Sequence, residues 1–139
     1  MRRFGLIGFP LGHSFSKKYF TEKFLLEGID ARYDLYELKS LEEFAELKVS
    51  ENLCGLNVTI PYKQQIIPFL DEMDETAAEI GAVNVIKFIR NGNDLKLKGY
   101  NSDAIGFLQS IRPYLKPHHN KALILGTGGA SLAFDYILR

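Results

Sequence analysis

The chain has 139 residues, of which 46% are hydrophobic and 24% charged, so it can bury a core without disulfides or metals. Seventeen basic residues balance seventeen acidic ones, which disfavours a nucleic-acid-binding protein because such proteins carry a basic excess. The single cysteine, Cys54, cannot form an internal disulfide, and this fits a reducing compartment.

Two arginines and a short apolar run follow Met1, as in a signal peptide. The run is broken by Gly5, Gly8 and Pro10, and no small-x-small cleavage pattern follows it. A first strand and its turn explain the segment better. No apolar run approaches the length of a membrane span, so we expect a cytoplasmic protein that has no membrane partner.

Apolar periodicity and turn residues predict an alternation of strands and helices. In chain order we expect a strand at 4–9, a helix at 16–28, a strand at 31–38, a helix at 40–49, a strand at 54–60, two short helices at 62–70 and 74–81, strands at 82–90 and 95–100, a helix at 103–111, a connector at 112–120, a strand at 121–126 and then the start of a last helix.

Local signals mark several of these boundaries. Ser16 is placed to cap the first helix, and Gly28 is a stop signal at its end. Ser40 and Glu43 have the spacing of a capping box. Pro68 is expected to disturb the helix predicted at 62–70, since proline removes a backbone donor.

The alternation favours an α/β fold: an open, mostly parallel sheet in a three-layer arrangement, with helices on both faces. The segment "NGND" at 91–94 separates two strand patterns and predicts one antiparallel hairpin. The last strand, glycine turn and helix have the order found at the start of a Rossmann domain.

The glycine turn "GTGGAS" is a candidate cofactor loop. Gly126, Gly128 and Gly129 would let backbone N–H groups approach a pyrophosphate at the start of a helix. Ser131 stands where the full fingerprint has Gly or Ala, and a glycine turn without a ligand stays an alternative. The residue that selects NAD or NADP lies about twenty positions further on, past Arg139, so we expect an incomplete site.

A second candidate group lies in "NVTIPYKQ". Asn57 and Thr59 point to the same side of their strand because side chains alternate, and Lys63 follows in the next helix. All three can converge at the carboxyl end of the strand, where open α/β sheets bind ligands. The alternatives are an asparagine that only satisfies backbone groups and a solvated lysine.

Two serines follow the first strand. The hydroxyls of Ser14 and Ser16, together with helix N–H groups, suit a carboxylate, although simple N-capping explains either serine alone. His13 lies between the first strand and these two serines, and we interpret it as a turn residue.

Two further junctions carry polar side chains. Asn84 precedes the hairpin, and Asn101, Ser102 and Asp103 lie between its second strand and a helix. Asp103 is a candidate functional carboxylate, and its alternative role is that of a helix cap.

The adjacent pair His118 and His119 suggests a metal site. The pair lies in a connector flanked by prolines, and no third ligand is near it in sequence. We therefore expect both histidines to be solvated and predict no metal.

Five segments, "GFPLGHSFS", "GLNVTIPYK", "IGAVNVI", "GYNSDAIGF" and "ILGTGGAS", follow one another in an order and spacing that resembles the shikimate dehydrogenase family. The resemblance implies an NADP-dependent enzyme of aromatic amino-acid biosynthesis that reduces 3-dehydroshikimate to shikimate. It also implies a substrate domain at residues 1–112, and a connector with the first strand–helix unit of an NADP-binding Rossmann domain at 113–139.

The resemblance further implies roles for the polar side chains of the substrate domain. Ser14 and Ser16 would hold the substrate carboxylate. The substrate hydroxyls would bind Thr59, Asn84 and Asp103, with Asn57 nearby. Lys63 would donate and accept the proton, paired with Asp103, which makes these two residues the catalytic pair. A positioned lysine can both donate a proton and stabilise a developing alkoxide.

For the cofactor, the resemblance assigns the NADP pyrophosphate to the glycine loop and adds Glu75 as a further contact. The loop residues are Gly126, Thr127, Gly128, Gly129 and Ala130.

The chain departs from the family pattern at five positions and in length. Lys17 replaces a common Pro, Phe20–Thr21 a common His–Asn, Tyr62 a His and Val85 a Thr. Family members are about twice as long, so we expect a chain that ends just inside the cofactor domain and is inactive alone.

Two alternative functions stay open: a quinate-using relative of the family and a non-catalytic binding domain. For the oligomeric state we expect a monomer or a homodimer.

Overall fold

A computed structural model of the chain describes residues 1–50 and 52–139, and the described residues form one six-stranded sheet with helices. The strands are β1 (Arg2–Gly8), β2 (Ala31–Glu37), β3 (Leu53–Val58), β4 (Glu72–Met73), β5 (Val85–Asn91) and β6 (Asp94–Tyr100). The α-helices are α1 (Ser16–Leu26), α2 (Glu42–Ser50), α3 (Tyr62–Gln65), α4 (Glu75–Ile80), α5 (Asp103–Ile111) and α6 (Gly129–Leu138). Two 3₁₀ turns are η1 (Ile67–Phe69) and η2 (Arg112–Tyr114).

The sheet has the strand order β2-β1-β3-β5-β6-β4. β1 is parallel to β2 and β3, and β4 is parallel to β6, whereas β5 is antiparallel to both of its neighbours. The prediction of a mostly parallel α/β sheet with one hairpin is therefore confirmed. The two-residue strand β4 was not predicted, because its pattern is too short to register as a strand.

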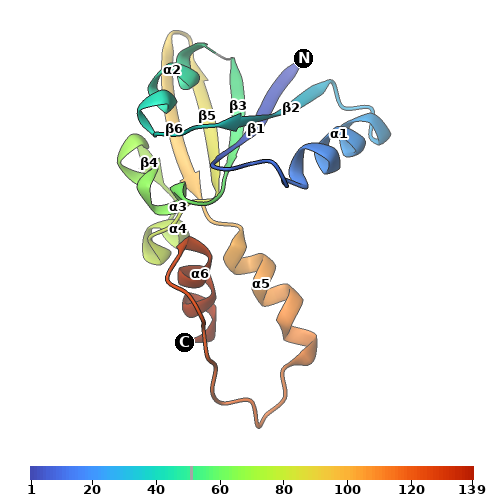
Figure 1. The fold of residues 1–139 in the computed structure, drawn as a ribbon, viewed down its shortest axis with the longest axis vertical. Helices are drawn as coiled ribbons and strands as arrows, with labels where there is room; N and C mark the ends of the chain where they lie inside the picture. The colour runs from blue at the N-terminus through green and yellow to red at the C-terminus, as the bar shows by residue number, and fades with distance from the viewer. Residues whose placement is uncertain (51) are drawn as a thin grey trace.

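Helices cover both faces of the sheet (Figure 1). On one face α2 and the α3–η1 segment enclose the main core, which includes Ile7, Phe44, Leu56, Ile66 and Ile86. On the other face α1 packs over β1 and β2 and forms a smaller aromatic core. Neighbouring side chains of β1 reach both cores, since Leu6 belongs to the aromatic core and Ile7 to the main core, as the pleat of a strand requires.

The helices α5 and α6 lie side by side below the sheet, at the edge where β1, β3 and β6 end (Figure 1). A third cluster joins them to α4, with Ile80, Ala82, Ala104 and Ala133 buried. Three of these four residues are alanines, and small side chains let helices approach closely. None of the helices in the described ranges is long and apolar enough to cross a membrane.

Most predicted boundary signals are confirmed. The Ser40 N–H donates to Glu43 Oε1 at 3.0 Å while the Ser40 hydroxyl accepts from the Glu42 N–H, so the capping box forms. Gly28 follows α1 with φ +62°, a backbone conformation that favours glycine. The helix predicted at 62–70 is interrupted as expected, since α3 ends at Gln65 and Pro68 lies within the 3₁₀ turn η1.

The prediction that Ser16 caps α1 is wrong. Ser16 is the first helical residue and Phe15 occupies the cap position, without a side-chain hydrogen bond. The Ser14 Oγ accepts from the Ser16 N–H at 3.3 Å instead. The helix has thus already begun at Ser16, and Ser14 supplies the local bond.

Two strand predictions need correction. The first strand of the hairpin begins at Val85 and not at residue 82, because the backbone of 82–84 turns toward α3 and β6. The strand predicted at 121–126 is wrong, since these residues pair with no strand in the described part of the chain. An apolar run needs a neighbouring strand before its backbone can form a ladder.

Candidate functional site

Lys63, Asp103 and Asn84 meet at the lower edge of the sheet. The Lys63 Nζ donates to Asp103 Oδ2 at 2.7 Å, and the Asn84 Nδ2 donates to Asp103 Oδ1 at 2.9 Å. The Lys63 and Asp103 side chains are 14% and 25% exposed, so both remain reachable from solvent. Both oxygens of the carboxylate are thus occupied, which fixes its plane and the direction of the ammonium group.

Backbone hydrogen bonds hold these three residues in register. The Lys63 carbonyl accepts from the Val83 N–H at 2.7 Å, and the Asn84 N–H donates to the Tyr100 carbonyl at 3.0 Å. Asn84 Oδ1 accepts from the Ser102 N–H at 2.8 Å. The loop before β5 therefore ties α3 to the junction between β6 and α5.

The N-cap residue of α5 is Ser102, and the side chain of Asn101, not that of Asp103, binds the first N–H groups of the helix. The Asn101 Oδ1 accepts from the N–H groups of Asp103 and Ala104, at 3.0 and 3.2 Å. Its Nδ2 donates to the Ala82 carbonyl at 2.9 Å, and Asn101 is 8% exposed. The capping role considered for Asp103 is therefore wrong, and its carboxylate is directed to Lys63 and Asn84.

Ser14, Ser16 and Thr59 line a second part of this edge. They surround a hollow of about 410 Å³, together with His13, Leu6 and residues 10–12. Thr59 follows the last residue of β3, and the two serines follow the turn after β1. The Ser14 hydroxyl accepts from the Ser16 N–H in the local bond. Its own hydrogen can still be donated to a ligand, so the two roles are compatible.

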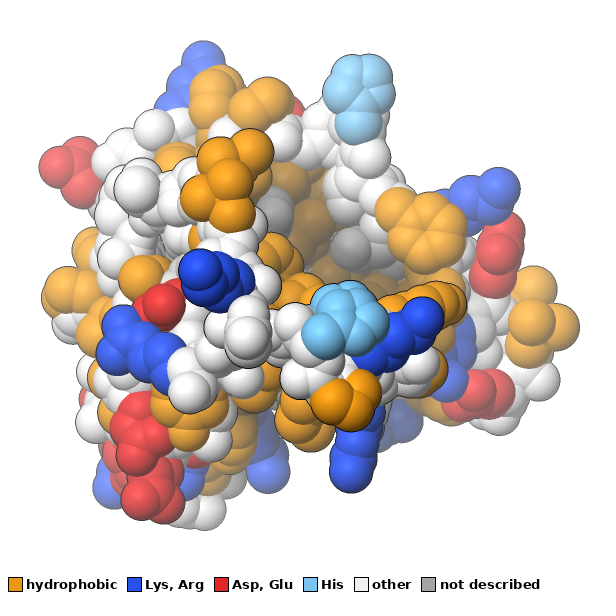
Figure 2. Space-filling view, turned by 90° about the horizontal axis from the view of Figure 1, so that it is seen from below, with side chains coloured by type: hydrophobic (Ala, Val, Ile, Leu, Met, Phe, Trp, Pro, Cys, Tyr) orange, Lys and Arg blue, Asp and Glu red, His pale blue; other side chains and the backbone are white. Residues whose placement is uncertain are grey.

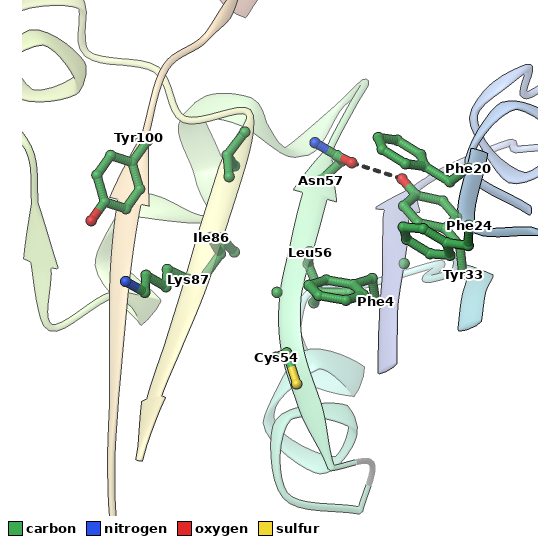
Figure 3. Close-up of a pocket in the computed structure, with 13 residues that line it drawn as sticks. Phe4, Phe20, Phe24, Tyr33, Cys54, Leu56, Asn57, Ile86, Lys87 and Tyr100 are labelled. Carbon is green, nitrogen blue, oxygen red and sulfur yellow. Dashed lines mark hydrogen bonds between the residues drawn. The ribbon is translucent and has the colours of Figure 1, made fainter. Parts of the chain in front are cut away.

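Asn57 is tied to a residue that the sequence did not single out, Tyr33 of β2. The Tyr33 hydroxyl donates to Asn57 Oδ1 at 2.8 Å, and the two side chains point toward each other across β1 (Figure 3). Phe20 stacks on the Tyr33 ring with centroids 4.6 Å apart. Burial raises the pKa of Tyr33, although a hydrogen bond with Ser16 lowers it in part. Tyr33 thus links Asn57 to the serine group.

The alternation of the strand at 31–38 was the one sequence signal for Tyr33, since it places that ring on an inner face. It did not reveal the partner, which lies 24 residues away. Asn57 also borders an apolar hollow between α1 and the hairpin, lined by Phe4, Phe24 and Tyr100 (Figure 3).

The glycine loop precedes α6 and is exposed along residues 126–128. Gly126 has φ +131°, which favours glycine, and Gly128 is the N-cap residue of α6. In the described chain no carbonyl or side chain accepts from the N–H groups of Gly129 and Ala130. These open donors at a helix start fit an anionic group such as a pyrophosphate.

Glu75 is the first residue of α4 and is exposed. An acidic residue there interacts favourably with the helix N-terminus. Within residues 1–50 and 52–139 no hydrogen bond or ion pair joins Glu75 to the glycine loop, and its link to a cofactor stays a prediction.

The histidine pair shows no metal-binding geometry. The rings of His118 and His119 lie 4.4 Å apart at a steep angle, and His119 Nδ1 accepts from the Lys116 N–H. Among the residues that the structure describes, no group of three His, Cys, Asp or Glu side chains can hold a metal ion.

The known proteins that this chain resembles in sequence are shikimate dehydrogenases. A family model described as the shikimate dehydrogenase substrate binding domain matches residues 6–86. The NADP(+) shikimate dehydrogenase of Aquifex aeolicus is 44% identical over 97% of this chain and 50% of its own length. The NADP(+) shikimate dehydrogenase of Methanosphaera stadtmanae is 43% identical over 96% of this chain and 47% of its own length. The chain spans about half the length of the curated relatives it matches.

Solved structures agree along 99% of this chain. Shikimate dehydrogenase 1 from Peptoclostridium difficile superposes with a TM-score of 0.86 at 35% identity, covering 51% of that chain. The Thermus thermophilus shikimate 5-dehydrogenase in complex with NADP(H) and shikimate has a TM-score of 0.81 at 31% identity, covering 52% of that chain. The match includes α6 and the connector, which the family model does not reach.

Proposed function

Because the chain belongs to the shikimate dehydrogenase family, we propose that it provides the substrate-binding and proton-transfer part of an NADP-dependent shikimate dehydrogenase. That enzyme would reduce 3-dehydroshikimate to shikimate in aromatic amino-acid biosynthesis. The observation that carries the proposal is the Lys63–Asp103–Asn84 group, in which a 2.7 Å ion pair is partly exposed.

The substrate would lie between two groups of polar side chains. Ser14 and Ser16 border one hollow with Thr59, and hydroxyl donors suit a carboxylate there. The Lys63 group would face the opposite end of the ring, where Asn84 and Asp103 can bind hydroxyls. Asn57, held by Tyr33, would lie between the two groups.

Lys63 would donate its proton to the oxygen of the ketone as negative charge develops on it. Asp103 would keep the ammonium group aimed at that oxygen and would help to return a proton to Lys63. In the reverse direction Lys63 would accept the hydroxyl proton, directly or through Asp103. NADPH, when bound, supplies the hydride for the reduction. The residues that would hold its pyrophosphate are those of the glycine loop, 126–130, whose open N–H groups fit such a ligand.

In this proposal residues 1–112 act as the substrate domain, while residues 113–139 connect to and begin the cofactor domain. We expect the 139-residue chain by itself to bind substrate without turning it over. Cytoplasmic location, a monomeric or homodimeric state and the contact of Glu75 with cofactor stay predictions.

The test joins residues 1–139 to the C-terminal half of the Aquifex aeolicus relative and follows NADPH oxidation with 3-dehydroshikimate. We expect turnover in this chimera, and a fall of roughly 10²–10⁴-fold in Lys63→Ala because an acid–base group is lost. Lys18→Ala, a change on the exposed side of α1, is the matched control and should leave the rate unchanged.

Three other results would point elsewhere. Shikimate binding by the 139-residue chain, with no turnover in a folded chimera, would favour a non-catalytic binding domain. A higher kcat/KM for quinate than for shikimate in the reverse assay would favour the quinate-using alternative. A near-normal rate in Lys63→Ala would remove Lys63 from the mechanism.

A further inference from the structure

Gly129, the first residue of α6, lies directly against the side chain of Lys63. A carbon placed at the Cβ position of Gly129 would lie 2.6 Å from the Lys63 Cβ and 3.2 Å from its Cδ. Carbon atoms in contact are normally about 3.5–4.0 Å apart, so no side chain fits at this position. The aliphatic part of Lys63 therefore rests on the bare backbone of Gly129.

The other two glycines of the loop do not share this constraint. Around both Gly126 and Gly128, a Cβ atom would meet no described atom within 4 Å. Gly126 has a positive φ of +131°, whereas Gly128 has φ −76°, which any residue can adopt. Close approach of a pyrophosphate explains glycines that face open space, but it does not explain one that faces a lysine.

Lys63 cannot easily move away from α6. Its carbonyl accepts from the N–H of Val83, which is fully buried, and the preceding Tyr62 ring is buried in the main core. A side chain at position 129 would therefore displace α6 or turn the lysine side chain. Turning the lysine side chain would lengthen the 2.7 Å bond between Lys63 Nζ and Asp103, and displacing α6 would remove the backbone against which the lysine packs.

We infer that Gly129 is a positioning residue for Lys63, and this inference rests on the proposed proton-transfer role of that lysine. Two contacts fix the side chain along its length: Gly129 at the Cβ end and Asp103 at the ammonium end. The glycine loop thus supports the acid–base residue in addition to offering N–H groups to an anion. A shift of the loop would be transmitted to Lys63 through this contact.

The first experiment compares Gly129→Ala with Gly128→Ala, its adjacent matched control, in the 139-residue chain. Lys63 side-chain NMR resonances report the ion pair through their response to Asp103→Asn. We expect this response to persist in the Gly128→Ala background and to be lost in the Gly129→Ala background. An unchanged response in Gly129→Ala, or equal losses in both, would overturn the inference.

A second measurement covers the case in which Gly129→Ala folds poorly. Overpacking should lower the Tm of this variant on the order of 4–12 °C. Lys63→Gly removes the atom that Gly129→Ala would strike, so the double variant should lose much less Tm relative to Lys63→Gly alone. If the loss is the same with either residue at position 63, or if the double variant also fails to fold, Gly129 is required for another reason.

Kinetics of the chimera separate this inference from the proposed function. Gly129→Ala should lower kcat by up to roughly 10²-fold through misplacement of Lys63, with a smaller change in KM for shikimate. If Lys63→Ala retains a near-normal rate, the proposed function loses its proton donor. The NMR and Tm measurements would still test whether Gly129 holds the Lys63 side chain. If Lys63→Ala is slow but Gly129→Ala keeps the kcat of the Lys18→Ala control, the positioning role is wrong.

Discussion

Two segments of the chain share one sequence pattern and reach different structures. Residues 4–8, "FGLIG", and residues 122–126, "ALILG", are both short apolar runs that end at a glycine turn before a helix. In the first, Leu6 and Ile7 are 5% and 0% exposed in β1. In the second, Leu123 and Leu125 are 84% and 87% exposed, and no strand forms.

The difference comes from the neighbours and not from the runs themselves. β1 lies between β2 and β3 and pairs with both, so its backbone donors and acceptors are satisfied on each side. Residues 122–126 have no such partner in the described ranges. A hollow of about 620 Å³ separates them from α5 and α6, and Figure 2 shows hydrophobic side chains gathered around a hollow on this lower face. Hydrophobicity selects segments for burial, but adjacent strands decide which ones become β-structure.

The strongest test of this comparison truncates one apolar side chain in each segment. Ile7→Ala should lower the free energy of unfolding by about 2–5 kcal/mol, because it removes a fully buried side chain from the main core. Leu125→Ala should change it by no more than about 0.5 kcal/mol, since that side chain is already in water. Urea denaturation followed by circular dichroism measures both. Equal losses would mean that 122–126 is packed in solution.

A second pair of changes compares tyrosine hydroxyls in the two regions. Tyr33→Phe leaves Asn57 Oδ1 without its 2.8 Å donor in a half-buried position, so we expect a loss of about 1–3 kcal/mol and weaker shikimate binding. Tyr114→Phe, in the turn η2 of the connector, should be nearly neutral because Tyr114 is 75% exposed. Unfolding and shikimate titration of the 139-residue chain provide the two measurements. Unaltered binding in Tyr33→Phe would exclude Tyr33 from the support of the site.

Much of the fold and part of the candidate site could be predicted from the sequence. The carboxyl end of the strand at 54–60 was expected to bring Asn57, Thr59 and Lys63 together, because open α/β sheets bind ligands there. The two serines and Asp103 were added to this group by the family resemblance, and in the structure β1 and β6 end at the same edge. Strand periodicity and glycine positions are local signals, and they were mostly sufficient for the elements themselves.

The features of the fold and site that could not be predicted depend on contacts between residues far apart in the sequence. Tyr33 belongs to the Asn57 group because β2 and β3 flank β1 on opposite sides, a strand order that no local pattern encodes. Asn101 rather than Asp103 binds the first N–H groups of α5, and its amide is held in place by the Ala82 carbonyl. The contact of Gly129 with Lys63 joins two motifs that sequence reasoning had assigned to separate ligands.

The two regions also differ in how their helices begin. The Asp74 Oδ1 accepts from the Ala77 N–H at 3.1 Å and caps α4, whereas α6 begins at Gly128 without a side-chain cap. Asp74→Ala should cost about 1 kcal/mol of unfolding free energy. The matched control Asp135→Ala breaks only the exposed Asp135–Arg139 pair of α6 and should cost about 0.3–0.5 kcal/mol. If the two aspartates cost the same, the cap does not contribute to α4.

The smallest expected effect concerns the bond that joins α6 to α4. The Tyr136 hydroxyl donates to Glu79 Oε2 at 2.6 Å, and this hydrogen bond, with the charge of Glu79, raises the pKa of Tyr136 above its usual value of 10.0. A raised pKa means that the folded state favours the protonated phenol. The stabilisation of the folded state by this hydrogen bond is therefore complete below pH 10, and it is lost as the pH rises through the pKa of Tyr136 in the folded protein.

Raising the pH above about 10 should thus loosen α6 before the sheet responds, since the phenolate and Glu79 repel each other. The methyl resonance of Ala133, which is fully buried beside α4 and α5, reports the packing of α6. We expect its shift to change with Tyr136 ionisation in the parent chain and to stay flat over the same range in Tyr136→Phe. An identical titration in both chains would assign the change to other groups. It would also mean that α6, like the segment before it, is not held by its polar contacts, and that apolar packing on α4 and α5 alone keeps Gly129 against Lys63.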